Sequence, residues 1–137
     1  LNRLGMSDRA TGYFTPVEML PAVGQGALGI ELRKDDTELL AGLAFLNDDK
    51  TTVAVTAERS FLIRLEGGCQ VPIGAFAEVD GNQVTLTGRV ASVDGTEAIK
   101  RGMSGAANGA QALGLRLAEQ LLDLGGREIL DEVYGQE

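Results

Sequence analysis

The sequence predicts an α+β fold in which helices cover one face of a small antiparallel sheet. Helix-spaced apolar residues occur on both sides of the middle of the chain, period-2 runs lie between them, and hairpin-type turn sequences separate those runs. The chain has 137 residues, enough for one ordinary domain together with a piece of another. We expect an incomplete unit over residues 1–46 and a complete domain over residues 47–137.

The first unit consists of short, interrupted elements. Leu1–Leu4 resembles the tail of a helix that ends at Gly5. Residues 27–33 alternate between apolar and polar side chains and predict a half-buried strand, while residues 36–45 carry the leucines of a short helix. These pieces have no core of their own. We therefore expect them to be fragments of an α/β domain whose other strands are missing from this chain.

The second unit opens with a predicted amphipathic helix. Asn47, Asp48 and Asp49 offer N-cap side chains, and Gly67 and Gly68 end the run. The helix-spaced apolar residues between these ends are Ala54, Ala57, Phe61, Leu62 and Leu65. We expect this stripe to face the core.

Period-2 runs after this helix predict an antiparallel meander. The first two runs begin at Ile73 and Val84, and the third covers residues 97–103. The sequences Asp80-Gly81-Asn82 and Asp94-Gly95 between the runs are typical of hairpin turns. A three-stranded antiparallel sheet is the simplest arrangement that uses both turns.

Two further helices are predicted after the sheet. The first begins at Asn108 and is closed by Gly125 and Gly126, and a second, short helix follows. The apolar stripes of the two helices consist of Leu113, Leu117, Leu121 and Leu124, and of Ile129, Leu130 and Val133. The order helix, three strands, helix, helix is typical of an α+β domain with its helices on one face of the sheet.

The composition excludes several classes of function. The chain has 12 Lys and Arg against 20 Asp and Glu, a net charge of −8, no His and one Cys. Without His there is no imidazole base and no Ser/His/Asp triad. One Cys cannot form an internal disulfide or a multi-cysteine metal site, so we expect no metal. The acidic balance disfavours phosphate-backbone binding, and we expect no nucleic acid partner.

The sequence also bears on location. No apolar run approaches the ~18 to 20 residues that a membrane helix needs, and no signal-peptide pattern opens the chain. With one unpaired Cys, these features lead us to expect a reducing cytoplasmic location and no membrane partner. The first residue, Leu1, suggests a cut end of a longer protein.

Residues 24–29 match the G-x-G-x-x-G pattern of dinucleotide-binding sites. That pattern requires a strand before it and a helix after it, so that the pyrophosphate meets a helix N-terminus. Here Pro21 precedes the pattern closely, and the residues after it alternate as in a strand. We therefore favour a flexible crossover loop or hinge over a nucleotide site.

Cys69 is the main candidate for chemistry. Most unpaired cysteines are buried structural thiols, and position alone leaves that alternative open. Gly67 and Gly68 nevertheless place Cys69 just beyond a helix end, where its sulfur can be approached. A thiolate is a strong nucleophile that forms water-stable carbon–sulfur bonds. Without His, its activation would require a cation such as Arg64 or the ligand itself, although Arg64 is more often a surface salt link.

Two segments of the chain carry specific sequence motifs. The first is Leu20-Pro21-Ala22-Val23-Gly24-Gln25-Gly26. The second combines Thr56-Ala57-Glu58-Arg59 with Leu65-Glu66-Gly67-Gly68-Cys69-Gln70-Val71-Pro72-Ile73-Gly74, which contains a very specific Gly-Gly-Cys-Gln-Val-Pro run. Together these segments resemble the porphobilinogen deaminase family, also called the hydroxymethylbilane synthases, and the resemblance covers the whole chain. It implies that the chain is the C-terminal portion, about two-fifths, of such an enzyme, and that residues 1–46 are pieces of periplasmic-binding-protein-like α/β domains.

The resemblance also implies a transferase with a dipyrromethane cofactor joined to Cys69 through a thioether. Such an enzyme adds four porphobilinogen molecules head-to-tail to this primer and releases ammonia and hydroxymethylbilane, a step of tetrapyrrole and haem biosynthesis. It implies that Arg3 binds carboxylates of the growing pyrrole chain, and that Gln25 and Gly26 form a hinge or line the cofactor.

The same resemblance implies what this segment lacks. The catalytic Asp and most of the substrate-binding arginines are expected in the missing N-terminal domains of the same enzyme, which is expected to work as a monomer. No catalytic residue is expected in this chain, which would then be inactive alone. The alternative is a non-catalytic acidic interaction module in which Cys69 is merely packed.

Overall fold

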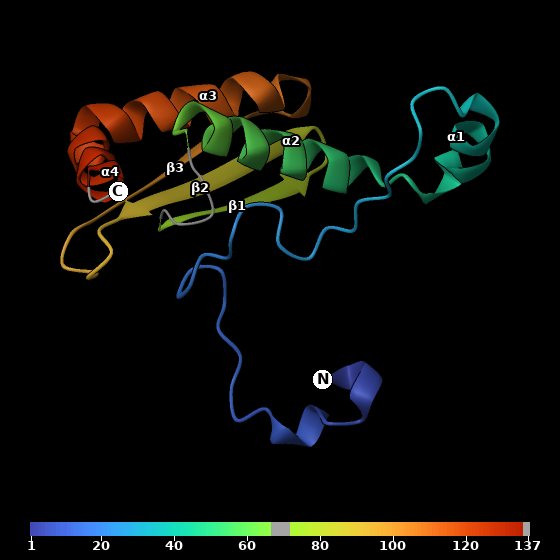
Figure 1. Ribbon diagram of the computed structural model, residues 1–137, viewed down its shortest axis with the longest axis horizontal. Coiled ribbons are helices and arrows are strands. Elements are labelled where there is room, and N and C mark those ends of the chain that lie inside the picture. The colour runs from blue at the N-terminus through green and yellow to red at the C-terminus, as the bar shows by residue number, and fades with distance from the viewer. Residues whose placement is uncertain (67–71, 136–137) are drawn as a thin grey trace.

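The computed structural model describes residues 1–66 and 72–135. Its helices are α1 (Thr37–Leu43), α2 (Asp49–Arg64), α3 (Ala110–Leu121) and α4 (Arg127–Tyr134), and its strands are β1 (Ile73–Asp80), β2 (Gln83–Ala91) and β3 (Ala98–Ala106) (Figure 1). Short 3-10 helices cover Asn2–Leu4, Ser7–Arg9, Ala44–Leu46 and Ala107–Gly109, and a π-helical turn, Leu122–Gly126, precedes α4.

The three strands form one antiparallel sheet in the order β1-β2-β3, which confirms the predicted meander. Gly81 and Gly95 adopt φ values of 55° and 75° in the two connections, a conformation that glycine reaches without a steric penalty. The third strand ends at Ala106 and is longer than the predicted run. Its continuation pairs with β2 as far as Gln83, so pairing rather than side-chain alternation sets its length.

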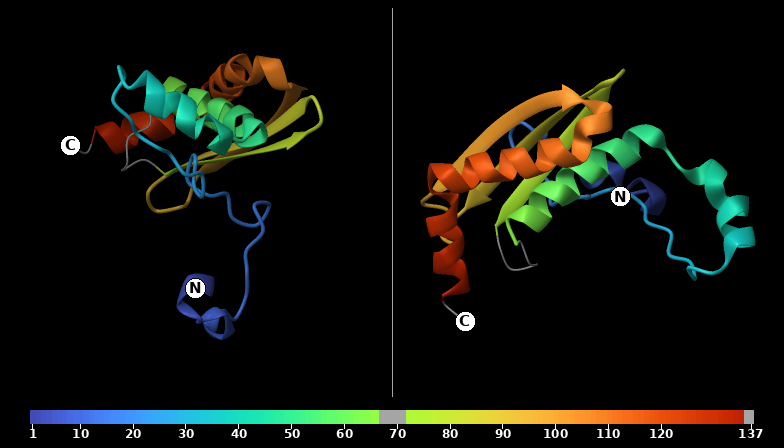
Figure 2. Two further views of the ribbon diagram at one scale, coloured as in Figure 1. Left: turned by 90° about the vertical axis from the view of Figure 1, so that its right-hand side faces the viewer. Right: turned by 90° about the horizontal axis from the view of Figure 1, so that it is seen from above.

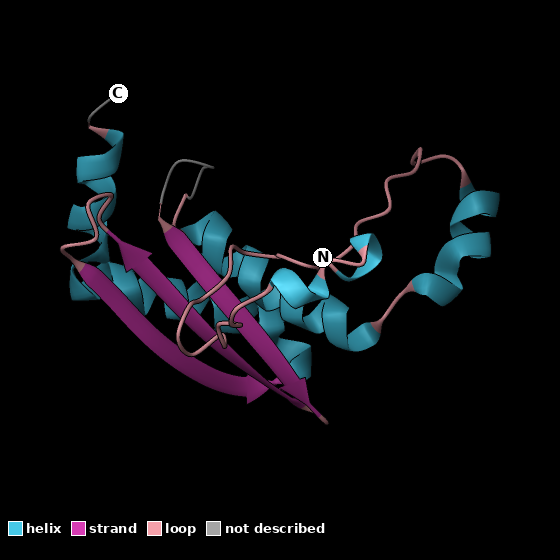
Figure 3. Ribbon diagram, turned by 90° about the horizontal axis from the view of Figure 1, so that it is seen from below, coloured by secondary structure: helices cyan, strands magenta, loops and turns pink. Residues whose placement is uncertain are grey.

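Helices α2 and α3 cover one face of this sheet, as predicted (Figures 2 and 3). Helix α2 contacts β1 and β2, whereas α3 contacts β2 and β3. Helix α2 begins at the predicted cap, where the Asp48 carboxylate accepts a hydrogen bond from the backbone N–H of Thr51 at 2.7 Å. The two helices and the sheet therefore form an α+β unit with two layers.

The core lies between these two layers. The bulky side chains with no more than 2 % exposure are Phe61, Leu65, Val84, Leu86, Val90, Leu113, Leu117 and Leu121. The ring of Phe61 lies directly over Gly88 of β2, where an added Cβ would be 2.4 Å from the ring. All buried members of the core cluster belong to residues 57–130, while Val23 packs against it from the first part of the chain.

One predicted position of the α3 stripe is wrong. Leu113, Leu117 and Leu121 are fully buried, but Leu124 is 46 % exposed. Helix α3 ends at Leu121, and the π-helical turn Leu122–Gly126, which contains the non-helical Gly125 with a φ of 104°, follows it, so the register of α3 does not extend to residue 124. Leu122 is buried there instead, with 6 % exposure.

The predicted strand over residues 27–33 is also wrong. This segment has no regular secondary structure, and Leu28 and Ile30 are 91 % and 57 % exposed. A strand needs a neighbour to pair with, and none of the described strands offers one here. The predicted short helix over residues 36–45 is confirmed by α1, whose N-cap is Asp36.

Candidate functional site

The segment that carries Cys69 connects α2 to β1. Cys69 itself lies outside the described residues, but both of its flanks are described. Before it, Leu65 is buried and Glu66 adopts a φ of 55°, an uncommon conformation for a residue other than glycine. After it, the carbonyl of Pro72 accepts a hydrogen bond from the N–H of Ala91 at 3.1 Å. The sheet therefore holds the C-terminal flank of this segment.

The N-terminal flank is held by the last helix. The hydroxyl of Tyr134, at the end of α4, donates a hydrogen bond to the carbonyl of Glu66 at 2.5 Å. Residues that lie 68 positions apart thus meet where α2 ends. No local pattern in the sequence predicts this contact.

Arg64, considered above as a cation for thiol activation, is engaged elsewhere. Its Nε donates a hydrogen bond to Oε1 of Glu119 at 2.6 Å, and its Nη2 donates to Oε2 of the same carboxylate at 3.0 Å. The hydrogen bond with Glu119 is the main reason why the pKa of Arg64 is raised above its usual value. The expectation of a surface salt link is confirmed for this residue.

The predicted crossover residues Gln25 and Gly26 lie in a tight turn against α2 and β1. Gly24 and Gly26 have φ values of 70° and 88°, and the side-chain oxygen of Gln25 accepts a hydrogen bond from the N–H of Ala22 at 3.1 Å. Residues of this turn, of α2 and of β1 together line a cleft of about 200 Å³. The first helix after this turn is α1, which begins at Thr37. The turn therefore lacks the helix N-terminus that a dinucleotide site requires.

The most informative residue at this turn is Glu58, which was expected only as a member of the motif Thr56-Ala57-Glu58-Arg59. Glu58 lies on α2 and is 6 % exposed. One carboxylate oxygen accepts from the N–H of Gly24 at 2.7 Å, and the other accepts from the N–H of Ala77 at 2.8 Å. A sequence signal existed, because Glu58 is four residues after Ala54 and three before Phe61, on the apolar stripe of the helix.

Arg3 is not brought together with these residues. It lies in the 3-10 helix Asn2–Leu4, which stands apart from the sheet and its helices (Figure 1). The shallow depression at Arg3 is lined by neighbours from residues 1–13 alone. Gly5 ends this helix in the left-handed conformation, with a φ of 63°, as predicted.

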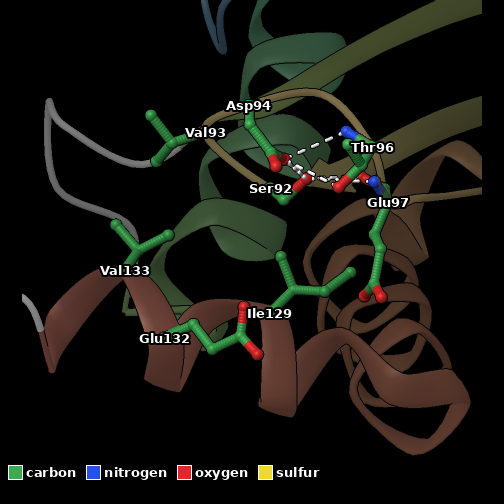
Figure 4. Close-up of a pocket in the computed structure, with 8 residues that line it drawn as sticks. All are labelled: Ser92, Val93, Asp94, Thr96, Glu97, Ile129, Glu132 and Val133. Carbon is green, nitrogen blue, oxygen red and sulfur yellow. Dashed lines mark hydrogen bonds between the residues drawn. The ribbon is translucent and has the colours of Figure 1, made fainter.

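A separate cavity of about 330 Å³ lies between the β2–β3 connection and α4 (Figure 4). Asp94, Glu97 and Glu132 contribute carboxylates to its lining. Asp94 accepts hydrogen bonds from the Ser92 hydroxyl and from the N–H and hydroxyl of Thr96, which lower its pKa to about 2. Because all of these partners lie within two residues of Asp94, its carboxylate stabilises the hairpin turn.

Residues 1–66 and 72–135 contain neither a group of potential metal ligands nor a membrane-spanning helix. These residues contain no grouping of three or more Cys, Asp or Glu side chains arranged to hold a metal ion. None of the helices described there combines the length and apolar character needed to cross a bilayer.

Family models match two parts of the chain. Residues 52–123 match the model described as "Porphobilinogen deaminase, C-terminal domain", and residues 1–41 match "Porphobilinogen deaminase, dipyromethane cofactor binding domain". The first match covers more than half of the chain and includes Cys69 and Glu58. The second includes Arg3, Gln25 and Gly26.

Curated relatives are similar along the whole chain. A porphobilinogen deaminase of Geotalea uraniireducens is 53 % identical over 137 residues, and one of Geobacter metallireducens is 54 % identical over 138. One of Maridesulfovibrio salexigens is 51 % identical over 134 residues. Each alignment includes 98 to 100 % of this chain but only 43 to 44 % of the relative, so the chain spans less than half the length of these proteins. On the match of its residues 52–123, supported by these identities, the chain belongs to the porphobilinogen deaminase family.

Proposed function

We propose that this chain is the C-terminal part of a porphobilinogen deaminase that polymerises four porphobilinogen molecules on a cysteine-linked primer and releases hydroxymethylbilane. The observation that carries the proposal is the similarity of the whole chain, including Cys69, to relatives of that name at 50 % identity or more. The reaction makes the protein a transferase of tetrapyrrole and haem biosynthesis.

The residues present fit a covalently held dipyrromethane. Cys69 is the only thiol of the chain, and it follows a helix whose end is held by Tyr134. The thioether formed by this thiol is a carbon–sulfur bond that water does not readily break. The match of residues 1–41 to a dipyrromethane-binding model supports the same cofactor. When bound, the cofactor would supply the terminal pyrrole carbon to which the first substrate is added, and each later substrate would add to the ring before it.

The chain's own contribution to this reaction is attachment and binding. Cys69 forms the sulfur–carbon bond to the cofactor. Arg3 is permanently cationic, so it can hold a carboxylate of the pyrrole chain when the rest of the enzyme surrounds it. Gln25 and Gly26 lie in the turn beside α2 and β1, from which they serve as a hinge or line the cofactor.

We also propose the division of the chain at about residue 46. The location of the buried core within residues 57–130 supports a C-terminal domain over residues 47–137. The exposed apolar side chains of residues 28–46 support their completion by N-terminal domains of the same enzyme, with a periplasmic-binding-protein-like architecture. Those domains would supply the catalytic Asp, and the complete enzyme would act in the cytoplasm without nucleic acid or membrane partners.

The mass of the denatured protein tests this proposal. In the complete enzyme, we expect an adduct of dipyrromethane size on the Cys69 peptide and turnover of porphobilinogen. The substitution Cys69→Ser removes the only thiol, so both the adduct and the turnover should disappear. Mass spectrometry of the intact chain and of its proteolytic peptides gives the first readout, and porphobilinogen consumption gives the second.

Two results would contradict the proposal. One is an unmodified Cys69 in complete enzyme isolated from cells that make the cofactor. The other is an adduct that persists in Cys69→Ser. Slow alkylation of an unmodified Cys69 in the folded protein, together with no turnover, would instead support a packed thiol in a non-catalytic module.

A further inference from the structure

Glu58 is a buried acidic residue between segments that are distant in sequence. It lies on α2, and its two carboxylate oxygens accept hydrogen bonds from the main-chain N–H groups of Gly24 and Ala77. Gly24 lies 34 residues before Glu58, and Ala77 lies 19 residues after it. One side chain therefore joins the crossover turn, α2 and β1.

Both donors are groups that would otherwise lack a partner in the fold. Ala77 belongs to β1, an edge strand of the sheet, and its N–H points away from β2. Gly24 belongs to a turn in the left-handed conformation. Ala77 is buried and Gly24 is half-buried. A buried N–H without a partner costs roughly 1–3 kcal/mol, so the carboxylate that binds both donors stabilises the contact between these segments.

Two further hydrogen bonds join the crossover segment to the sheet. The carbonyl of Pro21 accepts from the N–H of Ala75 at 3.1 Å, which satisfies the next outward-facing donor of β1. Nζ of Lys100, on β3, donates to the carbonyl of Val17 at 2.8 Å. Gly74 leaves room for this approach, because an added Cβ would lie 3.1 Å from the Pro21 carbonyl oxygen. The crossover thus runs along the edge and the open face of the sheet.

From these contacts we infer that Glu58 is a positioning residue that fixes the crossover turn, residues 22–27, on the C-terminal domain. The inference rests on the proposed function in one respect, since the same turn carries Gln25 and Gly26 and β1 follows the Cys69 segment. By tying Gly24 to Ala77, Glu58 sets where the turn lies relative to the domain that bears the cofactor. It acts through backbone contacts and touches no reacting atom.

The substitution Glu58→Gln tests this role with little change in shape. A carboxamide keeps one acceptor oxygen but presents an NH₂ group to the other backbone donor, so one of the two bonds is lost. Glu58→Asp is the second variant, because a side chain shorter by one methylene cannot reach both donors. Glu78→Gln is the matched control, since Glu78 is an exposed neighbour of Ala77 on β1 and undergoes the same change of charge.

Hydrogen exchange in the complete enzyme is the main readout. We expect at least one of the amides of Gly24 and Ala77, the one that faces the new NH₂ group, to exchange at least about tenfold faster in Glu58→Gln than in the parent enzyme or in Glu78→Gln. Amides of α3 should keep their protection. We also expect kcat for porphobilinogen to fall several-fold while the mass of the Cys69 adduct stays the same.

Unchanged exchange at Gly24 and Ala77, a uniform rise that includes α3, or an unchanged kcat would overturn the inference. If neither Glu58 variant folds, the parent enzyme still decides, because Gly24 and Ala77 amides that exchange as fast as in an unfolded peptide would also overturn it. Failure of the proposed function gives a different result. The parent enzyme would then lack the adduct and the turnover, while the exchange of Gly24 and Ala77 would still report on the tie.

Discussion

Two carboxylates show how the same side-chain chemistry serves different purposes. Most acidic residues of this chain are exposed, as expected from its net charge of −8. Glu58 is buried and joins distant segments, whereas Asp94 is exposed and binds groups within two residues of itself. The difference lies in the donors: Asp94 closes a local turn, and Glu58 completes a tertiary contact.

Asp94 makes a prediction about acid stability. Its pKa is about 2 in the folded state, below the ordinary 3.8, because hydrogen bonds from Ser92 and Thr96 favour the ionised form. A lowered pKa stabilises the fold above about pH 4, and this contribution disappears as the pH falls through about 2. We expect Asp94→Asn to be less stable than the parent at pH 7 and to lose less stability between pH 4 and pH 2.

Urea unfolding at several pH values measures this difference. Asp80→Asn, at the end of β1 beside the other hairpin connection, is the matched control for the change of charge. A parent chain and an Asp94→Asn variant whose unfolding midpoints differ by the same amount at pH 7 and pH 2 would show that Asp94 contributes nothing to the acid response.

At the scale of elements, α2 and α3 approach each other closely. Gly114 of α3 lies against α2, and a Cβ added there would be 2.3 Å from the carbonyl oxygen of Ala57 and 2.9 Å from Cβ of Ser60. The two helices touch through their backbones at this point. The absence of a side chain at residue 114 therefore sets the distance between them.

The substitution Gly114→Ala should force the helices apart. Backbone atoms cannot rotate out of the way, so we expect a loss of about 1–3 kcal/mol in the free energy of unfolding. Gly42→Ala is the control, because Gly42 lies in α1 with open space around its Cα, and alanine there should be neutral or stabilising by up to about 1 kcal/mol. Thermal or chemical denaturation compares the variants. Equal stability of Gly114→Ala and the parent would contradict the close contact.

At the scale of the whole molecule, the two parts of the chain differ in burial. The core cluster lies entirely after residue 56. Before residue 47, large apolar side chains are widely exposed, including Phe14 and Val17 at 75 % and 80 %. The first part contributes to the second mainly Val23 and the hydrogen-bonding backbone groups of Val17, Pro21 and Gly24.

This asymmetry predicts that residues 47–137 fold without the first part. We expect them to unfold in one cooperative transition, less stable than the complete chain by about 1–3 kcal/mol because Glu58 loses Gly24 and the core loses Val23. Residues 1–46 alone should show no cooperative transition. Urea denaturation followed by circular dichroism tests both pieces, and a non-cooperative transition of residues 47–137 would refute the proposed domain boundary.

Local patterns in the sequence determined most of this fold. Helix-spaced apolar residues and the cap at Asp48 predicted α2, and the glycine turns predicted the meander, because each signal depends on residues only a few positions apart. The Gly-Gly-Cys-Gln-Val-Pro run likewise identified the family without any structure.

Only the tertiary structure decided the remaining features. A strand over residues 27–33 requires a partner, and alternation alone cannot show that the outward donors of β1 are already bound by Pro21 and Glu58. The exposure of Leu124 depends on the kink at Gly125, and the burial of Glu58 depends on donors from residues 24 and 77. These outcomes depend on contacts between segments that are distant in sequence, and a pattern of neighbouring residues does not show which distant segments will meet.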